Sequence, residues 1–185
     1  MLLIQFLTDA QERRVGILTG ATIRVIDGYT TTLELARAAI GSGQGLAQLA
    51  EGAAGAQQAD YDATAQAGRI LPPLDHPDAA HCYVTGTGLT HLGSADARDA
   101  MHQKIGGDIA ALSDSMKMFR LGVEGGKPST GTAGVQPEWF YKGDGSIVRA
   151  TGQDLEMPAF SLDGGEEPEI AGLYVIGDDG HPYRL

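Results

Sequence analysis

The prediction of the fold starts from one stretch of the chain, Gly165-Glu166-Glu167-Pro168-Glu169-Ile170-Ala171-Gly172-Leu173-Tyr174-Val175-Ile176-Gly177. Its second half is apolar and ends at Gly177, which predicts a buried strand over residues 170–176. Glu167 and Glu169 stand before that strand, two positions apart, so an extended chain places both carboxylates on one face. Two like charges held so close repel unless a cation or a shared proton lies between them. Oxygen ligands of this kind suit Mg²⁺, Mn²⁺ or Ca²⁺; the alternative is a solvated acidic loop in front of a strand.

The composition of the 185-residue chain limits the classes of protein to which it can belong. The formal net charge of −11 argues against nucleic-acid binding, which needs clustered Lys and Arg. The single cysteine, Cys82, excludes an internal disulfide framework and fits a reducing compartment. Residues 1–7 have no basic region, and their apolar run is too short for a signal or membrane segment. We therefore expect a cytoplasmic protein that binds neither nucleic acid nor a membrane.

Residues 1–72 predict a small N-terminal domain that begins with a β-meander. Strands are predicted at residues 2–7, 15–18 and 22–26. Gly20 separates the second strand from the third, and Asp27-Gly28 ends the third. This pattern is typical of antiparallel neighbours joined by tight turns.

Two helices are predicted after the meander. Thr31 followed by Glu34 predicts a capping box at the start of the first helix. Leu33, Ala36 and Ile40 then recur at helical spacing, and Gly41 is expected to stop the helix. A second, alanine-rich helix is expected near residues 46–53, and residues 57–68 predict a surface connection or a frayed helix.

Residues 73–185 predict the first part of a second domain, next to a proline-rich stretch at residues 71–77. A helix capped by Ser94 is expected to lead to an apolar stripe of core or interface residues at Ile109, Leu112, Met116 and Phe119. Residues 122–134 predict a Gly-rich loop that could act as a lid. Short strands are predicted at residues 82–84, 137–142, 147–148 and 157–160. Their density favours an antiparallel barrel or roll.

Several motifs succeed one another in a recognisable order. They are Thr85-Gly86-Thr87-Gly88-Leu89-Thr90-His91-Leu92-Gly93-Ser94, then Phe140-Tyr141-Lys142, then Glu167-Pro168-Glu169 leading into Val175-Ile176-Gly177. This order, over about residues 80–177, resembles the fumarylacetoacetate hydrolase superfamily. Residues 85–94 resemble a bacterial subfamily associated with the catabolism of arabinose and related sugar acids.

The resemblance implies an α+β fold, in which the small β-meander and helix domain precedes a mixed, fumarylacetoacetate hydrolase-like β-roll. It implies that residues 73–185 form only the N-terminal portion of that catalytic domain. The remaining acidic metal ligand is then expected beyond residue 185, in a longer protein. Relatives of this kind are commonly homodimers, so a homodimer is expected.

The resemblance also assigns roles to four residues. Glu167 and Glu169 would be ligands of a divalent metal, Mg²⁺ or else Mn²⁺ or Ca²⁺. His91 would be the catalytic histidine, the alternative being a loop histidine hydrogen-bonded to the backbone. Lys142 would contact the carboxylate or enolate of the substrate, the alternative being a surface lysine at the end of a strand. The histidines at positions 76, 81, 102 and 181 show no ligand spacing.

The implied function is that of a metal-dependent lyase, a dehydratase that acts on a 2-keto-3-deoxy sugar acid through a metal-held enolate. An alternative is a C–C bond hydrolase or a decarboxylase of a 1,3-diketo or 2-keto dicarboxylic acid. Ser94 stands where many relatives have a Glu after the histidine, which favours the lyase over the hydrolase. A third possibility, from another class, is a ligand-binding fragment without turnover.

Overall fold

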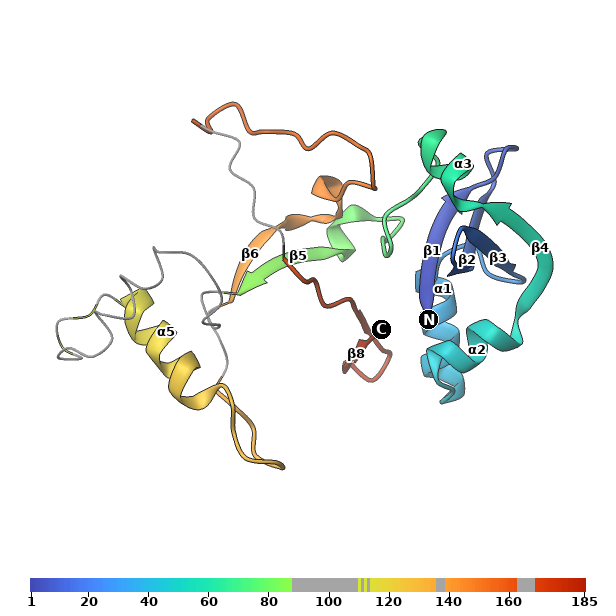
Figure 1. The fold of residues 1–185 in the computed structure, drawn as a ribbon. Helices are drawn as coiled ribbons and strands as arrows, with labels where there is room; N and C mark the ends of the chain where they lie inside the picture. The colour runs from blue at the N-terminus through green and yellow to red at the C-terminus, as the bar shows by residue number, and fades with distance from the viewer. Residues whose placement is uncertain (88–109, 111, 113, 136–138, 163–168) are drawn as a thin grey trace. The chain divides into compact units, whose positions relative to one another are not determined.

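The computed structural model describes residues 1–87, 110, 112, 114–135, 139–162 and 169–185, and over these residues the fold is α+β (Figure 1). The chain divides into two compact units, one formed by Met1–Cys82 with Gly145–Leu185 and the other by Tyr83–Asp144. The predicted domain boundary between residues 72 and 73 stays a prediction. None of the helices in the described ranges is long and apolar enough to cross a membrane.

A four-stranded antiparallel sheet forms the centre of the N-terminal region, in the order β1-β2-β3-β4. Its strands are β1 (Leu2–Leu7), β2 (Arg13–Thr19), β3 (Thr22–Ile26) and β4 (Ala54–Asp60). Gly20 adopts a φ of +59° in the turn between β2 and β3, a conformation that favours glycine. The predicted meander of three strands is confirmed.

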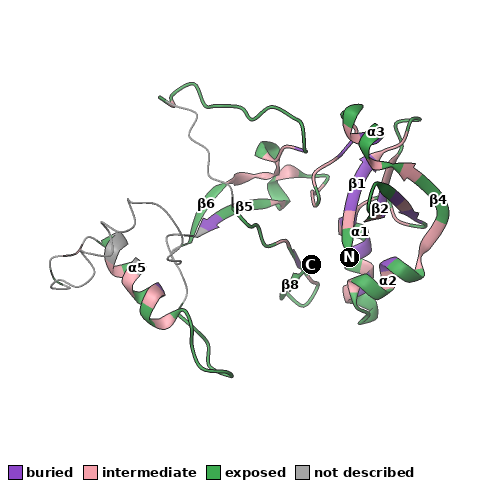
Figure 2. Ribbon diagram, viewed as in Figure 1, coloured by how far each residue is buried: buried purple, intermediate pink, exposed green. Residues whose placement is uncertain are grey.

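Both faces of this sheet are covered by apolar side chains, and Figure 2 shows the buried residues concentrated around it. One face carries a cluster of Ile4, Phe6, Ile23, Val25 and Ile70. The other face carries Val15, Ile17, Ile26, Leu35 and Ala50. The alternation of side chains along each strand sends them to the two faces in turn, and each large buried side chain contributes about 1.5–3 kcal/mol.

The first helix, α1 (Thr32–Ser42), begins with the predicted capping box: Thr31 Oγ1 accepts a hydrogen bond from the Glu34 N–H, and the Glu34 carboxylate accepts one from the Thr31 N–H. Its predicted end is wrong, since the helix continues through Gly41 and ends before Gly43, which has a φ of +67°. A glycine inside a helix costs only about 1 kcal/mol, whereas the left-handed cap position requires a residue that tolerates positive φ.

The predicted apolar face of α1 is also wrong in part. Its buried residues are Thr32, Leu35, Ala36 and Ala39. The expected Leu33 and Ile40 are only half-buried, because the sheet contacts a stripe that is rotated by one residue. The second helix, α2 (Leu46–Gly52), is confirmed.

The prediction of a surface connection or a frayed helix at residues 57–68 is right in part, since the second half of this stretch is helical. These residues contain the end of β4 and the helix α3 (Tyr61–Gln66), which Asp60 caps by accepting a hydrogen bond from the Ala63 N–H at 2.7 Å. β4 lies at the edge of the sheet and pairs with β3 alone, so its largely exposed polar residues give no apolar alternation to detect.

The unit Tyr83–Asp144 contains a two-stranded antiparallel ribbon and a helix. The ribbon pairs β5 (Tyr83–Thr87) with β6 (Trp139–Asp144), and its register shifts between Val84 and Thr85. The helix is α5 (Asp114–Gly125), so the first residues of the predicted Gly-rich loop at 122–134 are helical. The expected helix that starts at Ser94 lies outside the described residues.

The C-terminal part departs most from the sequence prediction. Only β7 (Tyr174–Ile176) forms a strand within the predicted stretch 170–176; it pairs with β8 (Pro182–Arg184), and Ile170 is fully exposed. β8 is three residues long, so the ladder stops at Tyr174, and only Val175 becomes buried. The predicted strands at 147–148 and 157–160 are wrong as well. They correspond to the 3-10 turn η3 (Gly145–Ile147) and to irregular chain, and a second 3-10 turn, η1 (Ala79–His81), precedes β5.

Candidate functional site

Two of the four predicted site residues lie in the described part of the chain. Lys142 lies on β6, and Glu169 lies in an irregular, exposed segment before β7. They belong to different compact units. His91 and Glu167 lie outside the described residues, so their roles stay predictions.

Lys142 is an exposed side chain placed across the β5–β6 ribbon. Its Nζ lies 5.6 Å from the centre of the Phe140 ring, which is within the range of a cation–π contact. Phe140 pairs with Gly86 on β5, and a Cβ added at Gly86 would lie 2.6 Å from both Lys142 Cε and Phe140 Cζ. Gly86 is therefore the residue that lets the two side chains lie flat on the neighbouring strand. Lys142 stands within the strand and not at its end.

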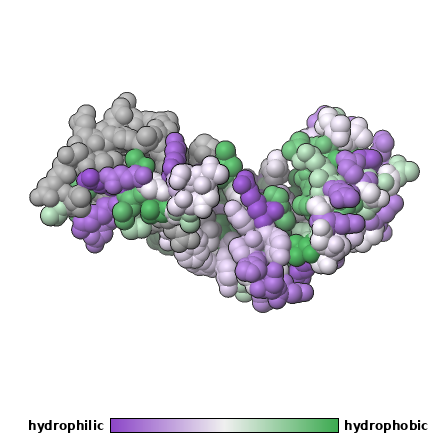
Figure 3. Space-filling model, turned by 90° about the horizontal axis from the view of Figure 1, so that it is seen from below, coloured by the Kyte–Doolittle hydropathy of each residue, from purple (hydrophilic) through white to green (hydrophobic). Residues whose placement is uncertain are grey.

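Aromatic side chains cover much of the same ribbon. Tyr83 and Tyr141 contact edge to face, with ring centres 6.3 Å apart and planes at 74°. Both remain exposed, as does Trp139. Figure 3 shows hydrophobic and hydrophilic residues interspersed on the visible face of the molecule.

The metal ligands predicted from sequence are only partly described. Glu169 offers a carboxylate, a hard oxygen donor of the type that Mg²⁺ accepts. Among the residues that the structure describes, no three or more His, Cys, Asp or Glu side chains gather in a way that could hold a metal ion. The described part thus supplies one of the two expected ligands, and the fit of the pair stays a prediction.

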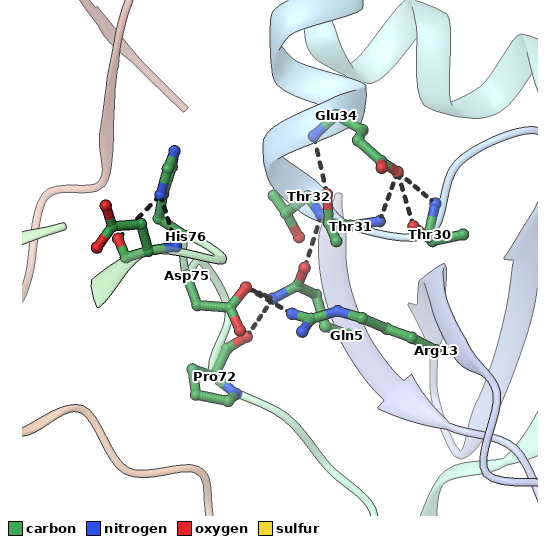
Figure 4. A network of polar contacts seen from close by, with 10 residues as sticks. Gln5, Arg13, Thr30, Thr31, Thr32, Glu34, Pro72, Asp75 and His76 are labelled. Carbon is green, nitrogen blue, oxygen red and sulfur yellow. Dashed lines mark hydrogen bonds and ion pairs between the residues drawn. The ribbon is translucent and has the colours of Figure 1, made fainter. Parts of the chain in front are cut away.

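A buried polar network that the sequence analysis missed links β1 and α1 to residues 72–75 (Figure 4). The Gln5 side chain is fully buried and accepts a hydrogen bond from the Thr32 N–H at 2.7 Å. Its amide nitrogen donates to the Pro72 carbonyl at 2.5 Å and to Asp75 Oδ1 at 3.2 Å. Arg13 Nη2 also donates to Asp75 Oδ1, at 2.5 Å. One detectable signal was a Gln inside an otherwise apolar strand.

Glu34 forms the outer part of this network. Its Oε2 accepts hydrogen bonds from the Thr30 N–H and the Thr30 hydroxyl, both at 2.8 Å, and from the Thr31 N–H. The Thr30 N–H above all, together with the Thr30 hydroxyl, holds the pKa of Glu34 below its ordinary value of 4.5.

The lowered pKa of Glu34 predicts an acid-sensitive contribution to stability. A carboxyl with a lower pKa in the folded state stabilises the fold above its unfolded pKa, and this stabilisation is lost as the pH falls through the folded pKa. We expect the wild type to lose free energy of unfolding relative to Glu34→Gln as the pH falls below 4.5. Urea unfolding of both proteins across a pH series measures this, and a pH-independent difference between them would contradict it.

A shallow hollow of about 400 Å³ lies beside this network, in the unit formed by Met1–Cys82 and Gly145–Leu185. Its lining includes Arg14 and Asp27, which carry opposite charges, and the polar side chains of Thr30 and Gln57. Arg14 already forms an ion pair with Glu12 at 2.7 Å. This lining favours no particular class of ligand.

Comparison of the sequence with models of known protein families and with curated proteins, and of the structure with solved structures, finds no match.

Proposed function

We propose that this chain is part of a divalent-metal-dependent lyase of the fumarylacetoacetate hydrolase kind, which dehydrates a 2-keto-3-deoxy sugar acid in the cytoplasm. The observation that carries the proposal is the order of the sequence motifs from Thr85 to Gly177. The proposal includes the family's mixed β-roll and a homodimer.

Lys142 is the described residue that gives the proposal its physical support. The chain has 24 acidic and 13 basic residues, so most lysines and arginines have carboxylates available to them. Within the described residues Lys142 forms no ion pair, and its ammonium lies over the Phe140 ring instead. An exposed cation held by a weak contact is free to bind the carboxylate of a 2-keto acid.

The roles of the proposed site residues follow from their chemistry. Glu167 and Glu169 would hold Mg²⁺, which polarises a 2-keto group and makes the neighbouring C3 proton more acidic when it is bound. His91 would take up that proton, and Lys142 would orient the substrate through its carboxylate. The hydroxyl at C4 would then leave as water, taking the proton that His91 removed from C3.

The proposal is tested by incubating the protein with Mg²⁺ and 2-keto-3-deoxy pentonates while the dehydration product is measured by chromatography. Lys142→Met is expected to raise KM by about tenfold or more, because the substrate loses one charge-assisted hydrogen bond. Lys117→Met is the matched control, because Lys117 is already paired with Asp114 at 2.9 Å.

Two other outcomes of that assay argue against dehydration. A product of C–C cleavage or decarboxylation would favour the hydrolase or decarboxylase instead. Binding of the keto acid without any turnover, measured by calorimetry, would favour a ligand-binding protein.

A further inference from the structure

Three exposed aromatic side chains follow one another on one side of the paired strands β5 and β6 (Figure 1). Trp139, Tyr141 and Tyr83 are 64%, 55% and 74% exposed. Trp139 and Tyr141 stand two positions apart on β6, so they point to the same side, about 6.5 Å apart along the strand. The rings of Tyr141 and Tyr83 contact each other edge to face, which places Tyr83 on that side as well. The three rings therefore form a row along the ribbon.

Polar side chains stand beside this row. In the strand register Thr85 lies directly opposite Tyr141, and Asp144 lies directly opposite Tyr83. Residues opposite each other in an antiparallel pair point to the same side of it. The exposed hydroxyl of Thr85 and the half-buried carboxylate of Asp144 thus accompany two of the three rings. We call the surface formed by Tyr83, Thr85, Trp139, Tyr141 and Asp144 the aromatic face.

The opposite side of the ribbon has a different chemistry. A Cβ added at Gly86 would point away from Thr85 and would lie 2.6 Å from both Lys142 Cε and Phe140 Cζ. The Lys142 ammonium and the Phe140 ring therefore lie on the side away from the aromatic face. Val84 alternates with Thr85 and lies there too. Among the described side chains of the two strands, the aromatic face holds neither a cation nor an aliphatic group.

This composition favours a sugar chain over the other partners that exposed rings attract. A protein interface has an apolar centre, and the aromatic face has no described aliphatic side chain to form one. A nucleic acid needs cations for its phosphates, whereas this face carries a carboxylate, in a chain with a net charge of −11. A neutral sugar presents C–H groups to the electron-rich face of an aromatic ring, and its hydroxyls bond to groups such as Thr85 and Asp144.

The side chains of the aromatic face lose little freedom when a ligand binds. Tyr and Trp side chains have only two rotatable bonds, and the edge-to-face contact holds Tyr83 and Tyr141 against each other. Thr85 is β-branched and therefore restricted in its side-chain torsion. Preorganisation of this kind raises affinity by lowering the entropy lost on binding.

We propose that the aromatic face binds a neutral, extended polysaccharide of the cellulose or xylan type. Successive sugar rings stack on Trp139, Tyr141 and Tyr83, while sugar hydroxyls bond to Thr85 and Asp144. An extended chain fits because the three aromatic rings follow the axis of a ribbon. Strand faces that carry aromatic side chains bind linear chains of sugars or bases in this manner. The site lies on the side of the ribbon away from Lys142, so it stands whether or not the proposed lyase activity is found.

The test uses the fluorescence of Trp139, the single tryptophan of the chain, in the whole 185-residue protein. Titration with cellohexaose is expected to shift the emission to shorter wavelength and to saturate, because a stacked sugar removes water from the indole ring. Glucose is expected to bind at least about tenfold more weakly, since it covers one ring instead of three.

Three variants separate stacking from hydrogen bonding. Tyr141→Ala is expected to weaken the binding of cellohexaose by about tenfold or more, whereas Tyr141→Phe keeps the ring and is expected to stay within about threefold of the wild type. Thr85→Val keeps the size and the strand preference of the residue, so the ribbon is retained. Because it removes a hydroxyl, it is expected to weaken binding by about fivefold.

The matched control is Tyr174→Ala, because Tyr174 is 53% exposed and lies on another strand, β7. It is expected to leave the affinity for cellohexaose unchanged. Circular dichroism of each variant checks that the fold is kept, as expected for exposed positions.

Four results would overturn the proposal. One is a Trp139 emission that neither cellohexaose nor xylohexaose changes, and another is a folded Tyr141→Ala variant that binds cellohexaose as tightly as the wild type. A change of emission that oligothymidylate saturates at lower concentration than cellohexaose would assign the face to nucleic acid. A dimer that Tyr141→Ala dissociates, in a protein that responds to neither sugar, would assign it to a second copy of the chain.

Discussion

Phe6→Ala is expected to lower the free energy of unfolding of the unit that contains the four-stranded sheet by about 4 kcal/mol. The Phe6 side chain is only 1% exposed, and it lies in a cluster with Ile4, Ile23, Val25 and Ile70. These neighbours belong to three different parts of the chain, so they are held in place by their own segments and cannot collapse into the space left by the ring. The cost thus includes both the lost burial and the cavity.

Leu2→Ala on the same strand is the control for this prediction. Leu2 is 65% exposed, and its truncation is expected to change the free energy of unfolding by about 0.5 kcal/mol or less. Urea unfolding monitored by far-ultraviolet circular dichroism measures both variants. Similar midpoints for Phe6→Ala and Leu2→Ala would show that the cluster around Phe6 is not the core of this unit.

Gln5→Leu is expected to cost about 3 kcal/mol, although leucine is close to glutamine in size. The substitution removes the acceptor of the Thr32 N–H and the donor to the Pro72 carbonyl, so that both backbone groups lose their partner. A buried polar group without a partner costs about 1–3 kcal/mol. Thermal and urea unfolding give the change in stability.

Two further variants separate hydrogen bonding from side-chain size. Gln58→Leu, at an exposed position of β4, is expected to have little effect. Gln5→Glu keeps the acceptor for Thr32 but places a second carboxylate beside Asp75, whose Oδ1 lies 3.2 Å from the glutamine nitrogen. It is therefore expected to be less stable at neutral pH than in acid. Gln5→Leu with wild-type stability would contradict the role assigned to the network.

Helices and strands that are determined by neighbouring residues were predicted from the sequence. The strands of the meander were found because apolar residues alternate between glycine-containing turns, and the start of α1 because Thr31 and Glu34 bond to each other's backbone. The end of α1 was misplaced since Gly41 and Gly43 look alike in sequence, while only Gly43 has a positive φ. The edge strand β4 was missed because its residues are mostly exposed.

Features that depend on distant partners were predicted less well. The apolar run at residues 170–176 was expected to be buried, but burial requires a covering layer, and within the described residues only β8 pairs with it. The Gln5 network joins residues 70 positions apart, which no spacing rule detects. Of the candidate site, Lys142 was correctly placed on an aromatic strand, yet its contact with Phe140 across Gly86 arises only from strand pairing.

Because Gly86 has no Cβ, the Lys142 side chain can lie against it, although the two residues are 56 positions apart in sequence. Any side chain at position 86 would occupy the volume that the aliphatic stem of Lys142 now fills. The end of a lysine side chain can move aside, whereas the Phe140 ring is stiff and equally close to position 86. In natural variants of this protein, a larger residue at 86 should consequently be accompanied by a smaller one at 140. Such paired exchange would trace the β5–β6 register through evolution.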